Sequence, residues 1–126
     1  MELDAIDHLV LTVRDISASI AFYTRVLGMR EITFGDNRRA LAFGRSKLNL
    51  HQAGNEFEPK AARPIPGAID ICLLTRTPMT AVMQHLAALH VAVEAGPMQR
   101  AGAQGPILSV YVRDPDGNLI ELSNPL

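Results

Sequence analysis

The sequence predicts an α+β fold in which two βαβββ repeats form a curved mixed sheet around a shared cleft. The same order of elements, an apolar strand, a helix and three short strands, occurs twice within 126 residues. The opening strands also match closely, AIDHLVL in one half against AIDICLL in the other, and internal duplication is a signal of the whole fold. Each half is too small to bury its own apolar face. We therefore predict one domain over residues 1–126, made of repeat one (1–52), a linker (53–66) and repeat two (67–126).

The first repeat begins with an apolar strand at Ala5–Val13, interrupted by Asp7 and His8. Asp15 is a favourable N-cap for the helix that follows, whose apolar residues recur at helical spacing. Gly28 stands where a left-handed C-terminal cap is expected. Three strands separated by glycine-containing turns complete the repeat, and we expect them at 29–34, 39–43 and 47–52.

The segment from Ala53 to Pro66 contains three prolines and no periodicity, so it is predicted to be a linker. The second repeat then opens with an apolar strand, and Thr77 is the expected cap of a helix with Pro78 in its first turn. The remaining elements are predicted from their local sequence: a first strand at 68–74, a strand at 91–95, a long loop at 96–106 and a closing hairpin at 109–123.

The closing hairpin has the clearest turn in the chain. Asp114-Pro115-Asp116-Gly117 places Asp, Pro and Gly at the first, second and fourth positions of a type I turn. The strand after the turn is apolar except for Glu121. An ionised carboxylate in such a strand is costly unless it is paired or binds a cation.

Composition excludes several classes of function. The formal charge of −1 with scattered basic residues gives no footprint for nucleic acid. No apolar run approaches the roughly 20 residues that span a bilayer, and the acidic N-terminus is not a secretory signal. One cysteine, Cys72, excludes an internal disulfide, and its apolar neighbours suggest a packing role. We expect a cytoplasmic protein.

Four polar residues interrupt the first and last strands of the two repeats: His8, His51, Asp70 and Glu121. The opening strands AIDHLVL and AIDICLL correspond, as do the closing strands KLNLHQ and NLIELS, and from this we expect His8 to be the counterpart of Asp70 and His51 the counterpart of Glu121. Two imidazoles and two carboxylates without thiolates suit a divalent Fe, Mn, Co, Ni or Zn ion. Taken singly, each is more often an ordinary hydrogen-bonded residue than a ligand. Their related positions in a duplicated unit favour the metal site.

These motifs resemble the vicinal oxygen chelate superfamily, which includes glyoxalase I, fosfomycin-modifying enzymes, methylmalonyl-CoA epimerase, extradiol dioxygenases and bleomycin resistance proteins. The resemblance covers nearly the whole chain. It rests on the repeated unit, the opening IDHLVLTV, AFYTRVLGM in the first helix and RDPDGNLIEL near the end. LNLHQ followed by EFEPKA is most similar to small, single-domain glyoxalase-domain-containing proteins.

The resemblance implies a particular set of site residues. His8 and Glu121 match the ligands of the first and last strands, His51 falls where glyoxalase I has a glutamate, and Asp70 where it usually has a histidine. Two alternatives remain: four ligands with the middle pair exchanged, or a triad of His8, His51 and Glu121 without Asp70. Tyr111 matches an aromatic position that lines the pocket of relatives, the alternative being a tyrosine packed on an edge strand.

The function implied is a metal-dependent enzyme that holds adjacent oxygens of a small-molecule substrate for isomerase, lyase or dioxygenase chemistry. Glu121 or Asp70 would act as the proton-transfer base, and Tyr111 would bind a substrate oxygen. The alternative is a metal-free protein that sequesters a small molecule, as bleomycin resistance proteins do. Because relatives commonly dimerise, we expect a homodimer, with the cleft formed within one chain or across two.

Overall fold

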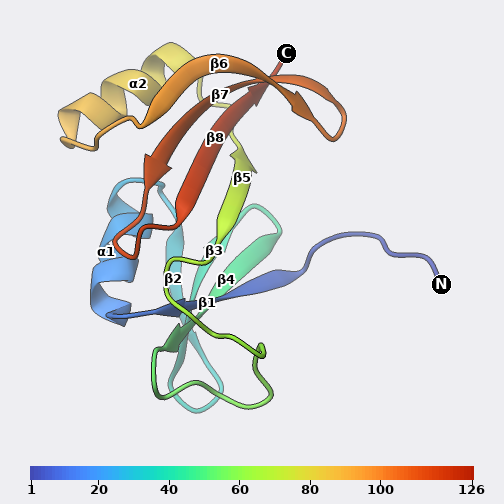
Figure 1. Cartoon of the computed structure of the whole chain (residues 1–126), viewed down its shortest axis with the longest axis vertical. Helices are drawn as coiled ribbons and strands as arrows, with labels where there is room; N and C mark the ends of the chain where they lie inside the picture. The colour runs from blue at the N-terminus through green and yellow to red at the C-terminus, as the bar shows by residue number, and fades with distance from the viewer. The chain divides into compact units, whose positions relative to one another are not determined.

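The computed structural model describes all 126 residues and divides into two compact units, Met1–Gly67 and Ala68–Leu126 (Figure 1). Each unit has the predicted order of strand, helix and three strands, which confirms the α+β class and the pair of βαβββ repeats. The segment predicted as a linker belongs to the first unit. Neither α1 nor α2 has the length and hydropathy of a membrane-spanning helix.

The first unit forms a four-stranded sheet in the order β1-β4-β3-β2. β1 and β4 are parallel, and the other neighbours are antiparallel. Its elements are β1 (His8–Val13), α1 (Ile16–Arg25), β2 (Arg30–Phe34), β3 (Arg38–Phe43) and β4 (Ser46–Gln52).

The second unit repeats this topology with the order β5-β8-β7-β6, in which β5 and β8 are the parallel pair. β7 pairs antiparallel with both β6 and β8. Its elements are β5 (Asp70–Leu74), α2 (Met79–Ala88), β6 (Ala95–Gly102), β7 (Gly105–Arg113) and β8 (Leu119–Pro125).

Local sequence fixes the ends of α1 as predicted. The Asp15 carboxylate accepts hydrogen bonds from the backbone N–H groups of Ser17 and Ala18, at 2.9 and 3.3 Å. These are two of the donors that a helix N-terminus leaves unpaired. Gly28 has φ +68°, the left-handed conformation expected just past a helix.

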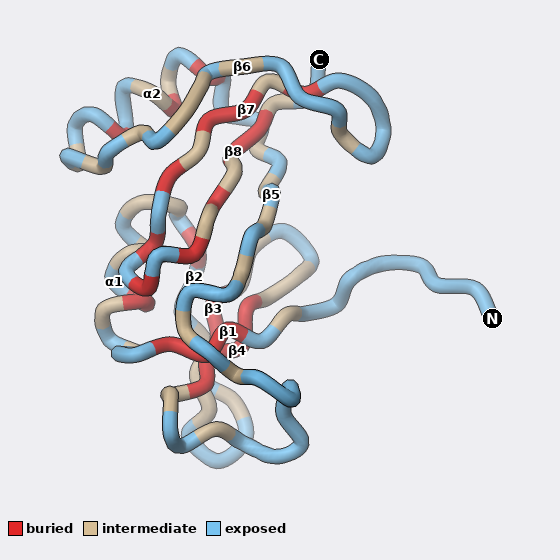
Figure 2. The backbone as a smooth tube through the Cα atoms, viewed as in Figure 1, coloured by how far each residue is buried: buried red, intermediate tan, exposed pale blue.

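Alternation along the strands gives each sheet two different faces. One face carries the apolar residues of the core, which are buried along the strands (Figure 2). In the first unit these are Leu11, Val13, Leu41, Leu48 and Leu50, and in the second Val110, Val112, Ile120 and Leu122. The helices bury Ile20 and Tyr23 of α1 and Met79, Val82 and Leu86 of α2. We call the opposite side of each sheet its open face.

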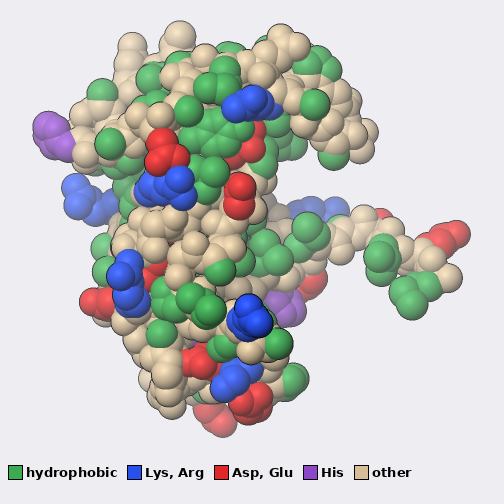
Figure 3. Space-filling model, viewed as in Figure 1, with side chains coloured by type: hydrophobic (Ala, Val, Ile, Leu, Met, Phe, Trp, Pro, Cys, Tyr) green, Lys and Arg blue, Asp and Glu red, His purple; other side chains and the backbone are tan.

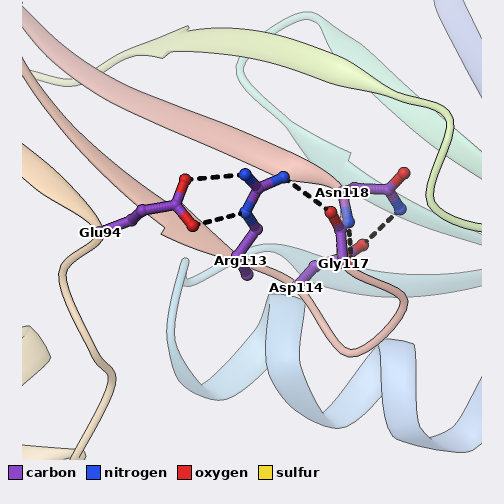
Figure 4. A network of polar contacts seen from close by, with 5 residues as sticks. All are labelled: Glu94, Arg113, Asp114, Gly117 and Asn118. Atoms are coloured by element: carbon purple, nitrogen blue, oxygen red, sulfur yellow. Dashed lines mark hydrogen bonds and ion pairs between the residues drawn. The ribbon is translucent and has the colours of Figure 1, made fainter.

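The predicted turn between β7 and β8 is confirmed (Figure 4). The backbone N–H of Gly117 donates to the carbonyl of Asp114 at 3.0 Å, as a type I turn requires. The Asp114 carboxylate accepts from the backbone N–H groups of Asp116 and Asn118 and from the Asn118 side-chain amide, at 2.7–2.9 Å. The Arg113 guanidinium donates to Glu94 and to the Gly117 carbonyl. The turn is thus stabilised by bonds within it, to Asp114, and by a bond from the flanking Arg113 to the Gly117 carbonyl.

Several predicted boundaries differ from the structure. β1 begins at His8, not at Ala5. The N-cap of α2 is Pro78, which has no side-chain cap bond; the expected cap, Thr77, instead donates its backbone N–H to the Thr75 hydroxyl.

The largest difference is β6, which occupies Ala95–Gly102. The strand predicted at 91–95 is therefore wrong except at Ala95, and most of β6 lies in the segment 96–106 predicted to be a loop. GPMQRAG has no apolar alternation, but it pairs with β7 up to the tight turn where Gly102 faces Gly105. Pairing with a neighbour therefore makes this strand, although its own composition does not.

Candidate functional site

The register of β1 and β4 separates the two predicted histidine ligands. His8 lies beside Lys47, whereas His51 lies beside Thr12. Both imidazoles are on the open face, but four positions apart, which is about 13 Å along the strands. The first unit therefore does not bring His8 and His51 together.

The two predicted carboxylates of the second unit are closer together. Asp70 lies beside Leu119 and Cys72 beside Glu121, so the acids share the open face with a stagger of two positions, about 7 Å. Asp70 is exposed and Glu121 half-buried.

Applying the register of the second unit to the first corrects the predicted correspondence. His8 pairs with Lys47 and Asp70 pairs with Leu119. If His8 and Asp70 are equivalent positions of the two units, the equivalent of Glu121 is Asn49, two positions before His51. The equivalent of His51 is Ser123. A slip of two residues keeps every side chain on its own face, so strand alternation could not reveal it.

Asn49 is thus a candidate that the sequence analysis missed. Its side chain is buried, with 5% of its surface exposed, and its Oδ1 has no hydrogen-bond partner. Unpartnered buried carbonyl oxygens are uncommon. The signal in the sequence was the LNL alternation of β4, which places an asparagine on the same face as His51.

His8 is held in a way that suits a metal ligand. Its Nδ1 lies 2.8 Å from the Asp7 carboxylate, and 45% of the His8 side chain is exposed. A carboxylate that accepts from Nδ1 leaves Nε2 as the free lone pair, which is the arrangement that orients ligating histidines. The exposed His8 ring is therefore available to a ligand through Nε2.

His51 lies in a different environment, which we call the closed cluster: Phe34, Arg38, His51 and Phe57. His51 is 3% exposed, and its Nε2 lies 3.4 Å from the Arg38 guanidinium. The Arg38 guanidinium stands 5.1 Å from the ring of Phe34 and 4.6 Å from that of Phe57. The Phe57 ring meets the His51 ring edge-on at 5.4 Å.

Burial lowers the pKa of His51, and the neighbouring Arg38 charge lowers it further against an opposing effect of Glu56. Both leading causes disfavour a positive charge on the imidazole. His51 is thus a neutral ring whose Nε2 faces a guanidinium, a poor place for a metal ion.

Four polar side chains cross the open face of the second unit, one from each strand; we call Arg100, Tyr111, Glu121 and Cys72 the polar row. The Arg100 Nε donates to the Tyr111 hydroxyl oxygen at 3.0 Å. Tyr111 pairs with Glu121, and Glu121 with Cys72.

Cys72 is exposed, so its predicted packing role is wrong. Desolvation raises the pKa of the Cys72 thiol, and the Glu121 carboxylate beside it adds to the rise, although a 3.3 Å contact with the Ser123 hydroxyl acts in the opposite direction. The thiol is consequently kept protonated beside the carboxylate.

The polar row borders a concavity of about 510 Å³ that lies entirely within the second unit. Its walls are the β6–β7 hairpin and the C-terminal end of β8, and the apolar lining side chains include Leu74, Ile107, Pro125 and Leu126. Figure 3 shows hydrophobic side chains gathered over β6, β7 and β8, with acidic and basic groups among them. A volume of this size suits a small organic molecule.

The donors suit a divalent metal in type, although neither unit gathers three or more His, Cys, Asp or Glu side chains by itself. His8 offers a free imidazole nitrogen, Asp70 and Glu121 offer carboxylates on one face, and Asn49 offers an unpartnered buried oxygen. Nitrogen and oxygen donors of this kind match the first-row divalent ions. In donor type, His8 and Asn49 of the first unit and Asp70 and Glu121 of the second each suit such an ion, whereas the setting of His51 does not.

This fold and donor set define the class of protein. Residues 5–122 match the Glyoxalase/Bleomycin resistance protein/Dioxygenase superfamily. The chain belongs to that superfamily, and the predicted resemblance is confirmed.

Two relatives share about half of their residues with this chain. Virulence protein STM3117 of Salmonella typhimurium is 54% identical over 123 residues, which is 98% of this chain and 85% of that protein. Glyoxalase domain-containing protein RDO1 of Mycosarcoma maydis is 51% identical over 98% of this chain and 70% of that protein.

Solved structures show the same fold. The crystal structure of STM3117 matches with a TM-score of 0.99 and full coverage of both chains at 53% identity. A lactoylglutathione lyase from Agrobacterium tumefaciens matches with a TM-score of 0.74 at 26% identity, covering 98% of this chain and 96% of that one.

Proposed function

We propose that this chain is a metal-dependent enzyme that binds a small molecule through two adjacent oxygens. His8, Asp70 and Glu121 are the proposed protein ligands of one divalent ion, and the Asn49 amide oxygen takes the fourth related position. The observation that carries the proposal is the shared stagger. In each unit the first-strand donor and the last-strand donor are two register positions apart on the open face.

The metal would supply Lewis-acid polarisation of the bound oxygens. The remaining roles belong to side chains of the chain itself. Glu121 has Cys72 on one side and Tyr111 on the other. Its carboxylate, or that of Asp70, is the proposed acceptor of a substrate proton.

Tyr111 is the proposed orienting group. Because its hydroxyl oxygen accepts from the Arg100 Nε, its own proton is left to donate to a substrate oxygen. This places the donor and the carboxylate on neighbouring strands of one face. Lactoylglutathione lyase activity in the relative from Agrobacterium tumefaciens agrees with chemistry of this kind.

Elemental analysis of purified protein after loading with Mn²⁺, Co²⁺, Ni²⁺ or Zn²⁺ and dialysis tests the ligand set. We expect about one ion per chain in the unaltered protein, and a loss of most of it in His8→Ala, Asp70→Asn and Glu121→Gln. His51→Gln should retain the ion. Retention of metal by Glu121→Gln, or its loss only in His51→Gln, would reject the assignment.

The second candidate is a metal-free protein that sequesters a small molecule. It is favoured by the concavity of the second unit, whose lining is largely apolar and which needs no residue of the first. Absence of bound metal under every loading condition, together with saturable binding of an apolar ligand, would select it.

A further inference from the structure

We propose that the concavity beside the polar row binds the non-reacting part of the substrate, and that this part is an apolar group carrying one acidic oxygen group held by Arg100. The proposal deepens the proposed function, because Glu121 belongs both to the concavity and to the metal ligands. It also names a class of ligand, small aryl or alkyl carboxylic acids.

The apolar part of the ligand follows from the walls. The hairpin from Ala101 to Pro106 forms one side, and Leu74, Ile107 and Pro125 contribute to the others. Leu74, at the C-terminal end of the edge strand β5, is 64% exposed, so this wall includes a large apolar side chain in contact with water. An apolar ligand removes such a surface from water, which favours binding.

The acidic group follows from the state of Arg100. Its Nε is used by the Tyr111 hydroxyl, and its guanidinium lies 5.6 Å from the Tyr111 ring. No carboxylate of the protein pairs with Arg100, which lines the concavity, so its Nη groups remain available to a ligand there. A planar guanidinium binds a carboxylate through two parallel hydrogen bonds, the strongest contact that it can make.

Another arginine of the second unit provides a contrast. Arg113, on the same unit, is satisfied by both Glu94 oxygens and the Gly117 carbonyl (Figure 4). Arg100 lines the concavity without such partners, and Glu121 is the other charged side chain of its lining. Opposite charges at two points orient an acid with its carboxylate at Arg100 and its body toward Glu121.

The test uses full-length protein stripped of metal, so that it does not depend on the metal site. Phenylacetate and 4-phenylbutyrate are titrated while the Arg side-chain Nε–H resonances are followed by NMR. Phenylacetamide serves as the neutral isostere. We expect saturable shifts of the Arg100 Nε–H signal with the acids, and binding weaker by about tenfold or more for the amide.

Arg100→Ala should weaken binding of both acids by about tenfold or more, Arg100→Lys less, because the ammonium keeps the charge but loses the fork. Arg76→Ala is the matched control, since Arg76 is an arginine of the same unit outside the concavity. Thermal unfolding verifies that each variant is folded, and metal content should be unchanged in Arg100→Ala. Equal binding of acid and amide, no saturable shift with either acid, or full binding by Arg100→Ala would overturn the inference. Metal-free protein that still binds the acids, with no metal bound under any condition, would instead refute the proposed function alone.

Discussion

The two units share a topology and a strand register, yet their open faces differ. In the first unit, Phe57 and Arg38 cover His51, and the imidazole is 3% exposed. In the second unit, Tyr111, Glu121 and Cys72 line a concavity that no side chain of that unit fills. In the first unit, Phe57 from the segment predicted as a linker thus covers part of the open face. In the second unit, the open face remains accessible to a ligand.

The largest expected effect concerns the core faces of the two sheets, which should contribute similarly to stability, in contrast to the open face of the second unit. Leu48→Ala in the first unit and Ile120→Ala in the second should each lower the free energy of unfolding by about 2–5 kcal/mol, because both side chains are almost completely buried. Leu74→Ala on the open face should change it by less than about 0.5 kcal/mol. Urea denaturation measures all three, and a large loss in Leu74→Ala would show that this face is covered.

The last-strand positions of the two units can be made equivalent by Asn49→Asp, which gives β4 the carboxylate that β8 has in Glu121. We expect metal binding about tenfold tighter or more, because a carboxylate attracts a divalent ion more strongly than an amide oxygen by over 1 kcal/mol even in a screened site. Calorimetric titration with Mn²⁺ measures the change. Asn55→Asp is the control, since Asn55 is exposed and outside the proposed ligand set; an equal gain there would mean that added charge alone is responsible.

Removing the cover of the first unit should be a smaller perturbation. Phe57→Ala deletes the contacts with Arg38 and His51, and we expect a loss of about 1 kcal/mol in stability, the size of a cation–π contact with an aromatic neighbour. Thermal or urea unfolding measures it. Tyr111→Phe, the matched change in the second unit, removes only the hydroxyl bonded to Arg100 and should cost less; the reverse order would contradict the comparison.

The titration of His51 sharpens the same contrast. Its pKa is lowered from the ordinary value of 6.5, so between the lowered value and 6.5 the unfolded chain binds more protons than the folded one. Stability therefore rises with pH across that window and is lost as the pH falls through it. NMR titration of the histidine ring protons should give a pKa below 6.5 for His51. Phe57→Ala should raise that pKa, because water would then reach the ring. An unchanged value in that variant would show that the ring is not what excludes solvent.

Sequence reasoning predicted the parts of the fold that depend on local chemistry. The Asp15 cap and the Asp114 turn are each stabilised by hydrogen bonds from nearby backbone N–H groups to a side chain. Such bonds can be predicted from a few consecutive residues. The duplication gave the topology. β6 could not be predicted, because GPMQRAG becomes a strand only through pairing with β7.

The candidate site was likewise predictable only where local sequence decides, and not where strand register does. His8 and Glu121 fall at motif positions, and as proposed ligands they lie on the open faces of β1 and β8. His51 and Asn49 share one face of one strand, so only the register, which depends on β1, tells them apart. The cover by Phe57 comes from a segment without periodicity, which offered no pattern to interpret.

The most direct measurement is calorimetric titration of Mn²⁺ into metal-stripped protein, comparing the unaltered chain with Glu121→Gln and His51→Gln. The account predicts one ion per chain in the unaltered protein and in His51→Gln, and no measurable binding in Glu121→Gln. Binding that survives in Glu121→Gln but disappears in His51→Gln would contradict it, because the ion would then belong to the closed cluster of the first unit.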